Sequence, residues 1–189
     1  MYTLIDDLEQ IVKVLHRAGV LFEVVGGVAV NAHLLNSHRS RTFVTRDIDL
    51  LIRREDLAAI VTAAEASGYQ GRKMFGGFAL LKPNQELAEA VHLLFANEKT
   101  RAAQVFPNPD VHPETKHLSE FGMSVPVVRL PDLVRMKLTS FRPKDETHIE
   151  ILDECGLISP ELAASLPDIL KTRLEEARSR YSTDEFDPS

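Results

Sequence analysis

Among its 189 residues the sequence has no tryptophan and only one cysteine, Cys155. A single cysteine excludes an intrachain disulfide, and the histidine spacing does not suggest a structural zinc site. No apolar run approaches the length of a membrane-spanning helix, and the N-terminus alternates apolar with acidic residues instead of following the pattern of a signal peptide. We therefore expect a cytoplasmic protein without a membrane partner.

Positive charge is also in deficit, because 22 Lys and Arg stand against 28 Asp and Glu, for a formal net charge of -6. This balance argues against sequence-independent wrapping of nucleic acid, and a small anionic substrate would need a cation beside it. The composition, 44% hydrophobic and 26% charged, is typical of a globular protein with one core. We predict a single domain over residues 1–181 and a disordered acidic tail over 182–189.

Apolar spacing predicts a mixture of helices and strands. Helices are expected over residues 3–18, 28–35, 55–67, 131–141, 143–155 and around Leu166–Leu174. Strands are expected over residues 22–25, 47–52, 90–96, 119–123 and 125–128, and on both sides of Gly76-Gly77. A polar loop should span 97–116. The order predicts an α/β (α+β) fold, with a small mixed sheet flanked by helices.

Two aspartates mark the first candidate site. Because side chains alternate along a strand, Asp47 and Asp49 should share one face while aliphatic neighbours pack on the other. Paired carboxylates on a rigid strand suit Mg²⁺, which prefers oxygen ligands and keeps positions open for water or phosphate. Gly26 and Gly27 should lie at a strand-to-helix turn, where backbone N–H groups can approach phosphate oxygens without a Cβ in the way.

Each of these features has a simpler interpretation when taken alone. An Asp-x-Asp pair is more often solvated or capping, and a glycine pair at a turn usually serves backbone geometry. The ordered series of strand, Gly-Gly, helix, basic segment and Asp-x-Asp strand favours a combined phosphate-and-metal site. The basic residues around the pair either form a solvated face or grip a triphosphate or RNA end: Arg39, Arg41, Arg46, Arg53 and Arg54.

These motifs resemble the nucleotidyltransferase fold of the DNA polymerase beta superfamily, particularly its small bacterial AbiEii-toxin-like members. The resemblance rests on Val24-Val25-Gly26-Gly27-Val28-Ala29 and on Thr45-Arg46-Asp47-Ile48-Asp49-Leu50-Leu51, and it resumes from Val125 to Leu152. It implies that Asp47 and Asp49 hold Mg²⁺, with Mn²⁺ as an alternative. It also implies that Gly26, Gly27 and Arg46 contact the nucleotide and that the C-terminal helices close over the site.

Lys137 lies on the apolar face of the helix predicted over 131–141. A lysine there either snorkels past the edge of the core or, as the resemblance implies, contacts substrate phosphates. Asp145, which follows Pro143 and Lys144, either caps the next helix or takes a catalytic role.

One position departs from the family pattern. Many relatives carry a third carboxylate on the central strand, and His92 stands where that carboxylate is expected. Four interpretations stay open: His92 is the general base, Asp145 serves instead, the protein binds nucleotide without catalysis, or His92 is a core histidine with a hydrogen-bond partner.

The resulting hypothesis is a Mg²⁺-dependent transfer of a nucleotidyl group from a nucleoside triphosphate to an acceptor hydroxyl on RNA or protein. Family analogy adds a role in a toxin–antitoxin pair, with an antitoxin partner. The alternative is a catalytically impaired protein of the same fold that binds a nucleotide or a partner.

Overall fold

A computed structural model describes residues 4–35, 44–118 and 123–184. The helices are α1 (Leu4–Ala18), α2 (Gly26–Leu35), α3 (Leu57–Glu65), α4 (Leu130–Ser140), α5 (Pro143–Glu154), α6 (Pro160–Ser165) and α7 (Asp168–Asp184), with short 3₁₀ turns η1 (Arg54–Asp56) and η2 (Leu87–Glu89). The strands are β1 (Phe22–Val25), β2 (Ile48–Ile52), β3 (Gln70–Met74), β4 (Gly77–Leu81), β5 (Val91–Phe95), β6 (Glu114–Leu118) and β7 (Met123–Val127). The chain is therefore an α/β protein, as its periodicity predicts.

Within the described residues the strands form one mixed sheet in the order β3-β4-β5-β2-β1-β7-β6. The central strand β2 runs antiparallel to β1 and parallel to β5, and β1 runs parallel to β7. Two antiparallel hairpins, β3–β4 and β6–β7, form the two ends of the sheet. Strands β1 and β2 are almost wholly buried, which explains their continuous aliphatic sequences.

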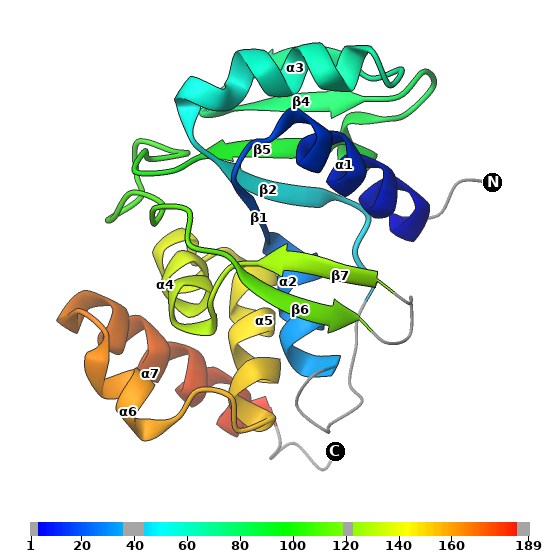
Figure 1. The fold of residues 1–189 in the computed structure, drawn as a ribbon. Helices are drawn as coiled ribbons and strands as arrows, with labels where there is room; N and C mark the ends of the chain where they lie inside the picture. The colour runs from blue at the N-terminus through cyan, green and yellow to red at the C-terminus, as the bar shows by residue number, and fades with distance from the viewer. Residues whose placement is uncertain (1–3, 36–43, 119–122, 185–189) are drawn as a thin grey trace.

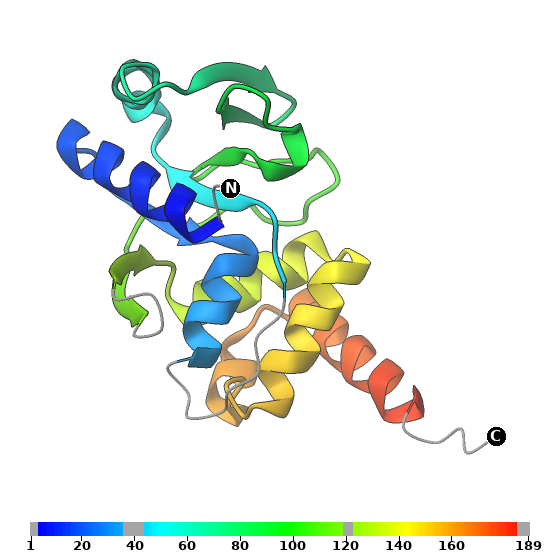
Figure 2. The same ribbon diagram turned by 90° about the vertical axis from the view of Figure 1, so that its right-hand side faces the viewer.

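The helices divide between two parts of the molecule (Figures 1 and 2). Helix α1 packs against α3, whereas α2 packs against β1 and β2 and also contacts α4 and α5. Helix α7 packs against both α4 and α5, so the C-terminal helices gather at the end opposite α3 (Figure 1). Buried Leu133, Val134 and Leu138 supply the apolar face of α4. Through these contacts α2 joins the C-terminal helices to the central strands β1 and β2.

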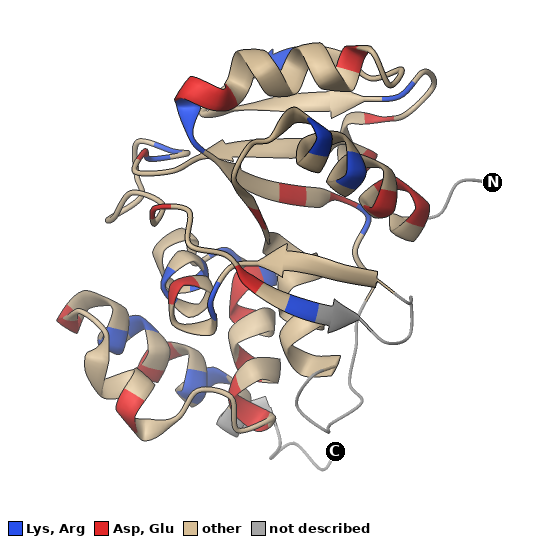
Figure 3. Cartoon of the chain, in the orientation of Figure 1, with Lys and Arg blue, Asp and Glu red and all other residues tan. Residues whose placement is uncertain are grey.

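Charged residues gather on the helices and loops, with acidic and basic positions interspersed, while the strands are mostly uncharged (Figure 3). This distribution is expected when the sheet forms the core. None of the helices in the described part of the chain combines the length and the apolar character that a membrane span requires.

The structure corrects three expectations at the chain's less regular segments. The predicted strand over residues 119–123 lies outside the described residues except for Met123, which begins β7, whereas β6 begins at Glu114, inside the loop predicted over 97–116. In the described sheet β6 is an edge strand that pairs with β7. An edge strand can carry polar residues, which is why the sequence pattern predicted a loop there. The short helix α6 was not expected, although the Ser159 hydroxyl caps it by accepting from the Leu162 amide at 3.2 Å. Helix α7 continues to Asp184, beyond the predicted start of the tail, and residues 185–189 lie outside the described residues.

Candidate active site

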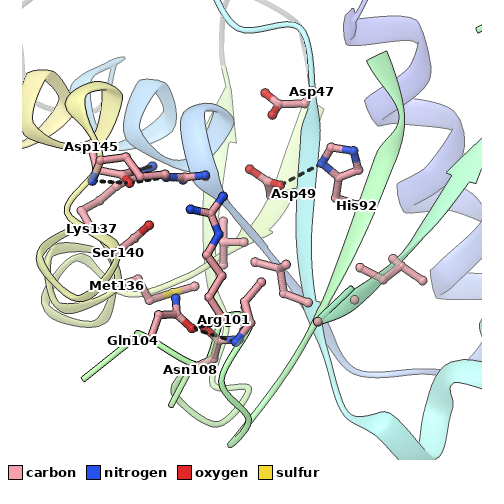
Figure 4. A pocket seen from close by; sticks show the side chains of 18 of the residues that line it. Asp47, Asp49, His92, Arg101, Gln104, Asn108, Met136, Lys137, Ser140 and Asp145 are labelled. Carbon is pink, nitrogen blue, oxygen red and sulfur yellow. Dashed lines mark hydrogen bonds and ion pairs between the residues drawn. The ribbon is translucent and has the colours of Figure 1, made fainter. Parts of the chain in front are cut away.

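Asp47, Asp49 and His92, which we call the strand group, come together at the N-terminal ends of β2 and β5 (Figure 4). Asp49 lies directly opposite His92 in the parallel β2–β5 register, and Asp47 immediately precedes β2. One potential ligand atom from each of the three side chains lies within 4.8 Å of the other two. The Thr45 hydroxyl donates to Asp47 Oδ1 at 2.9 Å and so orients that carboxylate. The parallel pairing thus adds a third potential ligand to the predicted pair.

Gly26 is the residue that lets the backbone pass beside Asp49. Its φ is +66°, and a Cβ placed on it would lie 2.0 Å from Asp49 Oδ2. A side chain at this position would therefore be strained and would also displace the carboxylate. Gly26 lies 21 positions before Asp47 and 23 before Asp49 in the sequence, yet all three residues line one cavity.

The charges of the strand group depend on one another. Burial alone would raise the pKa of Asp49, but His92, Lys137 and Lys144 together hold that pKa below its usual value. Asp49 in turn raises the pKa of His92, against the effect of burial. His92 Nδ1 lies 3.5 Å from Asp49 Oδ1, while Nε2 lies 3.0 Å from the carbonyl oxygen of Leu87. The ring is thus held between a backbone acceptor and a carboxylate.

Lys137, Arg142 and Asp145, the helix group, line the same cavity as the strand group, from α4 and the start of α5. Figure 4 shows Lys137 and Asp145 across from Asp47 and Asp49. Lys137 Nζ donates to Asp145 Oδ1 at 3.0 Å, and Arg142 Nε donates to Asp145 Oδ2 at 2.7 Å. Asp145 is 1% exposed, and the left-handed Phe141 between the helices turns the chain so that these side chains meet. Both carboxylate oxygens of Asp145 are therefore occupied by cations.

In the helix group one carboxylate, Asp145, partly neutralises two cations, Lys137 and Arg142. Burial alone would raise the pKa of Asp145, but Arg142 and Lys137 hold it far below its usual value. Burial lowers the pKa of Lys137, and Asp145 opposes that shift. Burial, reinforced by Lys137, lowers the pKa of the neighbouring His148 to about 4. Two cations share one anion, so the group presents net positive charge toward the strand group.

A cavity of about 450 Å³ separates the two groups. Its other walls are the tip of the β3–β4 hairpin and the loop after β5, which contribute Phe75, Phe78, Arg101, Gln104 and Asn108. Arg101 extends from this loop into the cavity (Figure 4). Sequence reasoning did not single out these wall residues, because a polar loop gives no periodic signal that relates it to a strand far away in the sequence.

Within the described part of the chain, the other residues predicted for the site do not line this cavity. Gly27 is buried inside α2 and does not line the cavity, although the helix that it helps to begin does start at Gly26. Arg46 is exposed and lies outside the cavity lining. Arg53 and Arg54 pair with Asp110 and Glu98 on the loop after β5. Arg39 and Arg41 fall outside the described residues.

No protein-family model and no curated protein matches this chain by sequence. Its fold is nevertheless similar to that of solved structures. An antigenic nucleotidyltransferase-like protein from Paracoccidioides brasiliensis aligns with a TM-score of 0.57 at 19% identity, over 96% of this chain and 90% of the other. ANT(2'')-Ia in complex with adenylyl-2''-tobramycin aligns with a TM-score of 0.52 at 17% identity, over 95% of this chain and 99% of the other. The chain has a nucleotidyltransferase-like fold.

The strand group of this nucleotidyltransferase-like fold has the donor set of a divalent metal site. Potential ligand atoms from two carboxylates and one imidazole lie within 4.8 Å of one another, and the 3.5 Å between His92 and Asp49 is close to the roughly 3 Å that separates cis ligands about 2.1 Å from a common ion. Lys144 Nζ lies 3.8 Å from Asp47 Oδ2 and is more than half exposed. The residues present therefore fit a bound metal ion.

Proposed function

We propose that this protein transfers a nucleotidyl group from a nucleoside triphosphate to an acceptor hydroxyl in a reaction that depends on a divalent metal. The observation that carries the proposal is the opposition of the strand group and the helix group across one cavity. A triphosphate is stabilised by cations on several sides, and a cavity with a metal site on one wall and fixed cations on another would supply them.

Each group has a distinct role in this proposal. Asp47, Asp49 and His92 would hold the metal, which supplies neutralisation of phosphate charge when it is bound. Lys137 and Arg142 would contact phosphate oxygens from the opposite wall, where burial strengthens a charge-assisted hydrogen bond. Asp145 is proposed as a positioning residue for both cations, because neither of its oxygens is free to accept a substrate proton.

The proposed reaction is a displacement at the α-phosphorus. The acceptor oxygen forms a bond to the α-phosphorus as the bond from that phosphorus to the bridging oxygen of the β-phosphate breaks, and pyrophosphate leaves with the bond's electron pair. The acceptor's proton passes to solvent or to a basic group at the cavity. Gly26 keeps the start of α2 close enough for its backbone to approach the substrate.

The charge of the cavity favours an anionic acceptor, for which RNA is the natural candidate. Besides the helix group, Arg101 and Lys144 line the cavity, whereas its acidic lining residues are Asp47, Asp49 and Asp145. Asp145 is neutralised by the helix cations and the other two face the metal position. The described lining therefore offers no free carboxylate cluster for a polycationic acceptor, and a protein hydroxyl is the competing outcome of the test.

The experiment is transfer of radiolabel from α-labelled nucleoside triphosphates to bulk RNA or bulk protein in the presence of Mg²⁺ or Mn²⁺. We expect label on RNA from the α-labelled but not the γ-labelled nucleotide, and loss of transfer in Asp49→Asn. Asp168→Asn, on a fully exposed side chain of α7, is the matched control. Transfer that is unchanged in Asp49→Asn would refute the assignment of the site.

A catalytically impaired nucleotide-binding protein is the second candidate, favoured by the direct approach of His92 to Asp49 where a third carboxylate was expected. Under this hypothesis the natural protein binds a triphosphate with metal but transfers no label, whereas His92→Asp gains transfer. Label transfer by the natural protein excludes it.

Assignment to the AbiEii-like toxin branch is a further part of the proposal and is supported only by the sequence resemblance. We expect growth arrest when the protein is expressed and relief by the product of a neighbouring gene, acting as the antitoxin. The arrest should disappear in Asp49→Asn, because a toxin of this type acts through its catalytic site. Undisturbed growth on expression of the natural protein would contradict this assignment.

A further inference from the structure

The orientation of the His92 ring is set by a backbone contact outside the cavity. Its Nε2 lies 3.0 Å from the carbonyl oxygen of Leu87, in the 3₁₀ turn η2 that precedes β5. A carbonyl oxygen can only accept, so Nε2 carries the hydrogen and donates it. The other ring nitrogen, Nδ1, is then the atom that has a lone pair in the neutral ring. Metal-ligating histidines are commonly held in this way, by a carbonyl that fixes the tautomer.

Nδ1 faces the Asp49 carboxylate (Figure 4). It lies 3.5 Å from Asp49 Oδ1, and both atoms carry lone pairs in the neutral-ring state. A cation fits between two such donors, either the proton of a charged imidazole or a metal ion that replaces this proton on binding. The third donor, a carboxylate oxygen of Asp47, lies within 4.8 Å of both. Three donors at this spacing can bind one ion from one side, which leaves its remaining positions for water and phosphate.

The donor set differs from a purely oxygen site in the metals it prefers. Mg²⁺ is a hard ion that is bound through oxygen, whereas an imidazole nitrogen raises affinity for first-row transition metals. We propose that His92 Nδ1 is a metal ligand and that the strand group therefore binds a transition-metal cation such as Mn²⁺ in preference to Mg²⁺. This inference rests on the metal dependence contained in the proposed function.

The test uses the full chain, Mn²⁺ alone and pulsed electron paramagnetic resonance, which detects nitrogen bonded to the ion. We expect coupling to nitrogen in protein labelled with ¹⁵N at histidine, and loss of that coupling in His92→Asn. His112→Gln is the matched control, because His112 is exposed and lies outside the cavity lining. The control should keep the coupling and the Mn²⁺ affinity of the natural protein.

Competition between Mn²⁺ and Mg²⁺ gives the second readout. We expect the natural protein to bind Mn²⁺ about tenfold more tightly than Mg²⁺ or better, and His92→Asp to reduce that ratio by about tenfold as the third ligand becomes an oxygen. Bound Mn²⁺ without nitrogen coupling in the natural protein, coupling that persists in His92→Asn, or absence of Mn²⁺ binding would each overturn the proposal. The measurement on the natural protein decides the ligand even where a variant fails to fold.

The outcome is separable from that of the proposed function. Nitrogen coupling without any label transfer supports the ligand assignment and refutes the reaction. Label transfer with Mg²⁺ and no nitrogen coupling supports the reaction and refutes the ligand assignment.

Discussion

The strand group and the helix group face each other across one cavity but differ in how their carboxylates are paired with cations. In the helix group Asp145 is 1% exposed and has a cation on each oxygen. In the strand group Asp49 and Asp47 are about one fifth exposed, and they lie 3.5 Å from His92 Nδ1 and 3.8 Å from Lys144 Nζ, respectively. One group satisfies its charges within itself, whereas the other leaves two partly exposed carboxylates at the cavity.

This difference predicts which substitutions mainly lower the stability of the fold and which mainly weaken metal binding. A buried ion pair whose partner is removed leaves an uncompensated charge in a poorly solvated place, which is costly to the folded state. A partly exposed carboxylate beside another carboxylate contributes little to folding and much to binding a cation. Substitutions in the helix group should therefore lower stability first, and substitutions in the strand group should abolish metal binding first.

Removal of Asp145 should have the largest effect on stability. Asp145→Ala leaves Lys137 and Arg142 side by side without an anion, and we expect the free energy of unfolding to fall by about 3–5 kcal/mol. Chemical denaturation of the variant and the natural protein measures this. The double variant Lys137→Met, Asp145→Leu should recover part of the loss because it removes both buried charges. Equal losses in the single and double variants would show that packing, not charge, holds the helices here.

Gly26→Ala should affect both stability and metal binding. The positive φ alone costs about 1–2 kcal/mol for a residue with a Cβ, and the overlap with Asp49 adds to it. Gly19→Ala is a matched control, since Gly19 has a φ of +67° and open space around its missing Cβ. We expect both variants to lose the stability that the positive φ costs a residue with a Cβ. Only Gly26→Ala should also lose Mn²⁺ binding in a titration. Equal Mn²⁺ affinity in the two variants would contradict the close approach of Gly26 to Asp49.

Glu23 extends the comparison to a buried carboxyl that has no ion pair among residues 4–35, 44–118 and 123–184. It is 1% exposed, it accepts from the His112 amide at 3.1 Å, and burial raises its pKa to about 7. The folded state therefore holds the proton more tightly than the unfolded state, so stability is lost as pH rises from about 4.5 to about 7.

Glu23→Gln should remove this pH dependence. We expect the variant to be more stable than the natural protein by about 1–3 kcal/mol at about pH 8, and the difference to shrink toward zero near pH 5. Chemical denaturation at the two pH values measures it, with the exposed Glu65→Gln on α3 as control. A difference that does not change with pH would show that Glu23 ionises as an exposed glutamate does.

Local patterns predicted much of the strand group and little of the helix group. Alternation identified the Asp47 and Asp49 pair, and turn chemistry placed Gly26 at the end of β1, because both signals act within a few residues. The resemblance pointed to His92, but its distance from Asp49 depends on the parallel pairing of β2 with β5. The partners of Asp145 and the approach of Arg101 depend on how helices and a loop pack, which no local pattern encodes.

Asp49→Asn should have the smallest effect on stability and sharpens the comparison most. The substitution keeps the size of the side chain, and it removes one of two neighbouring negative charges while weakening the contact with His92. We expect these effects largely to cancel, so that the free energy of unfolding changes by less than about 1 kcal/mol. Mn²⁺ titration of the same samples should show loss of binding, since an amide oxygen is a far weaker ligand than a carboxylate. Destabilisation as large as that of Asp145→Ala would mean that the strand group also stabilises the fold.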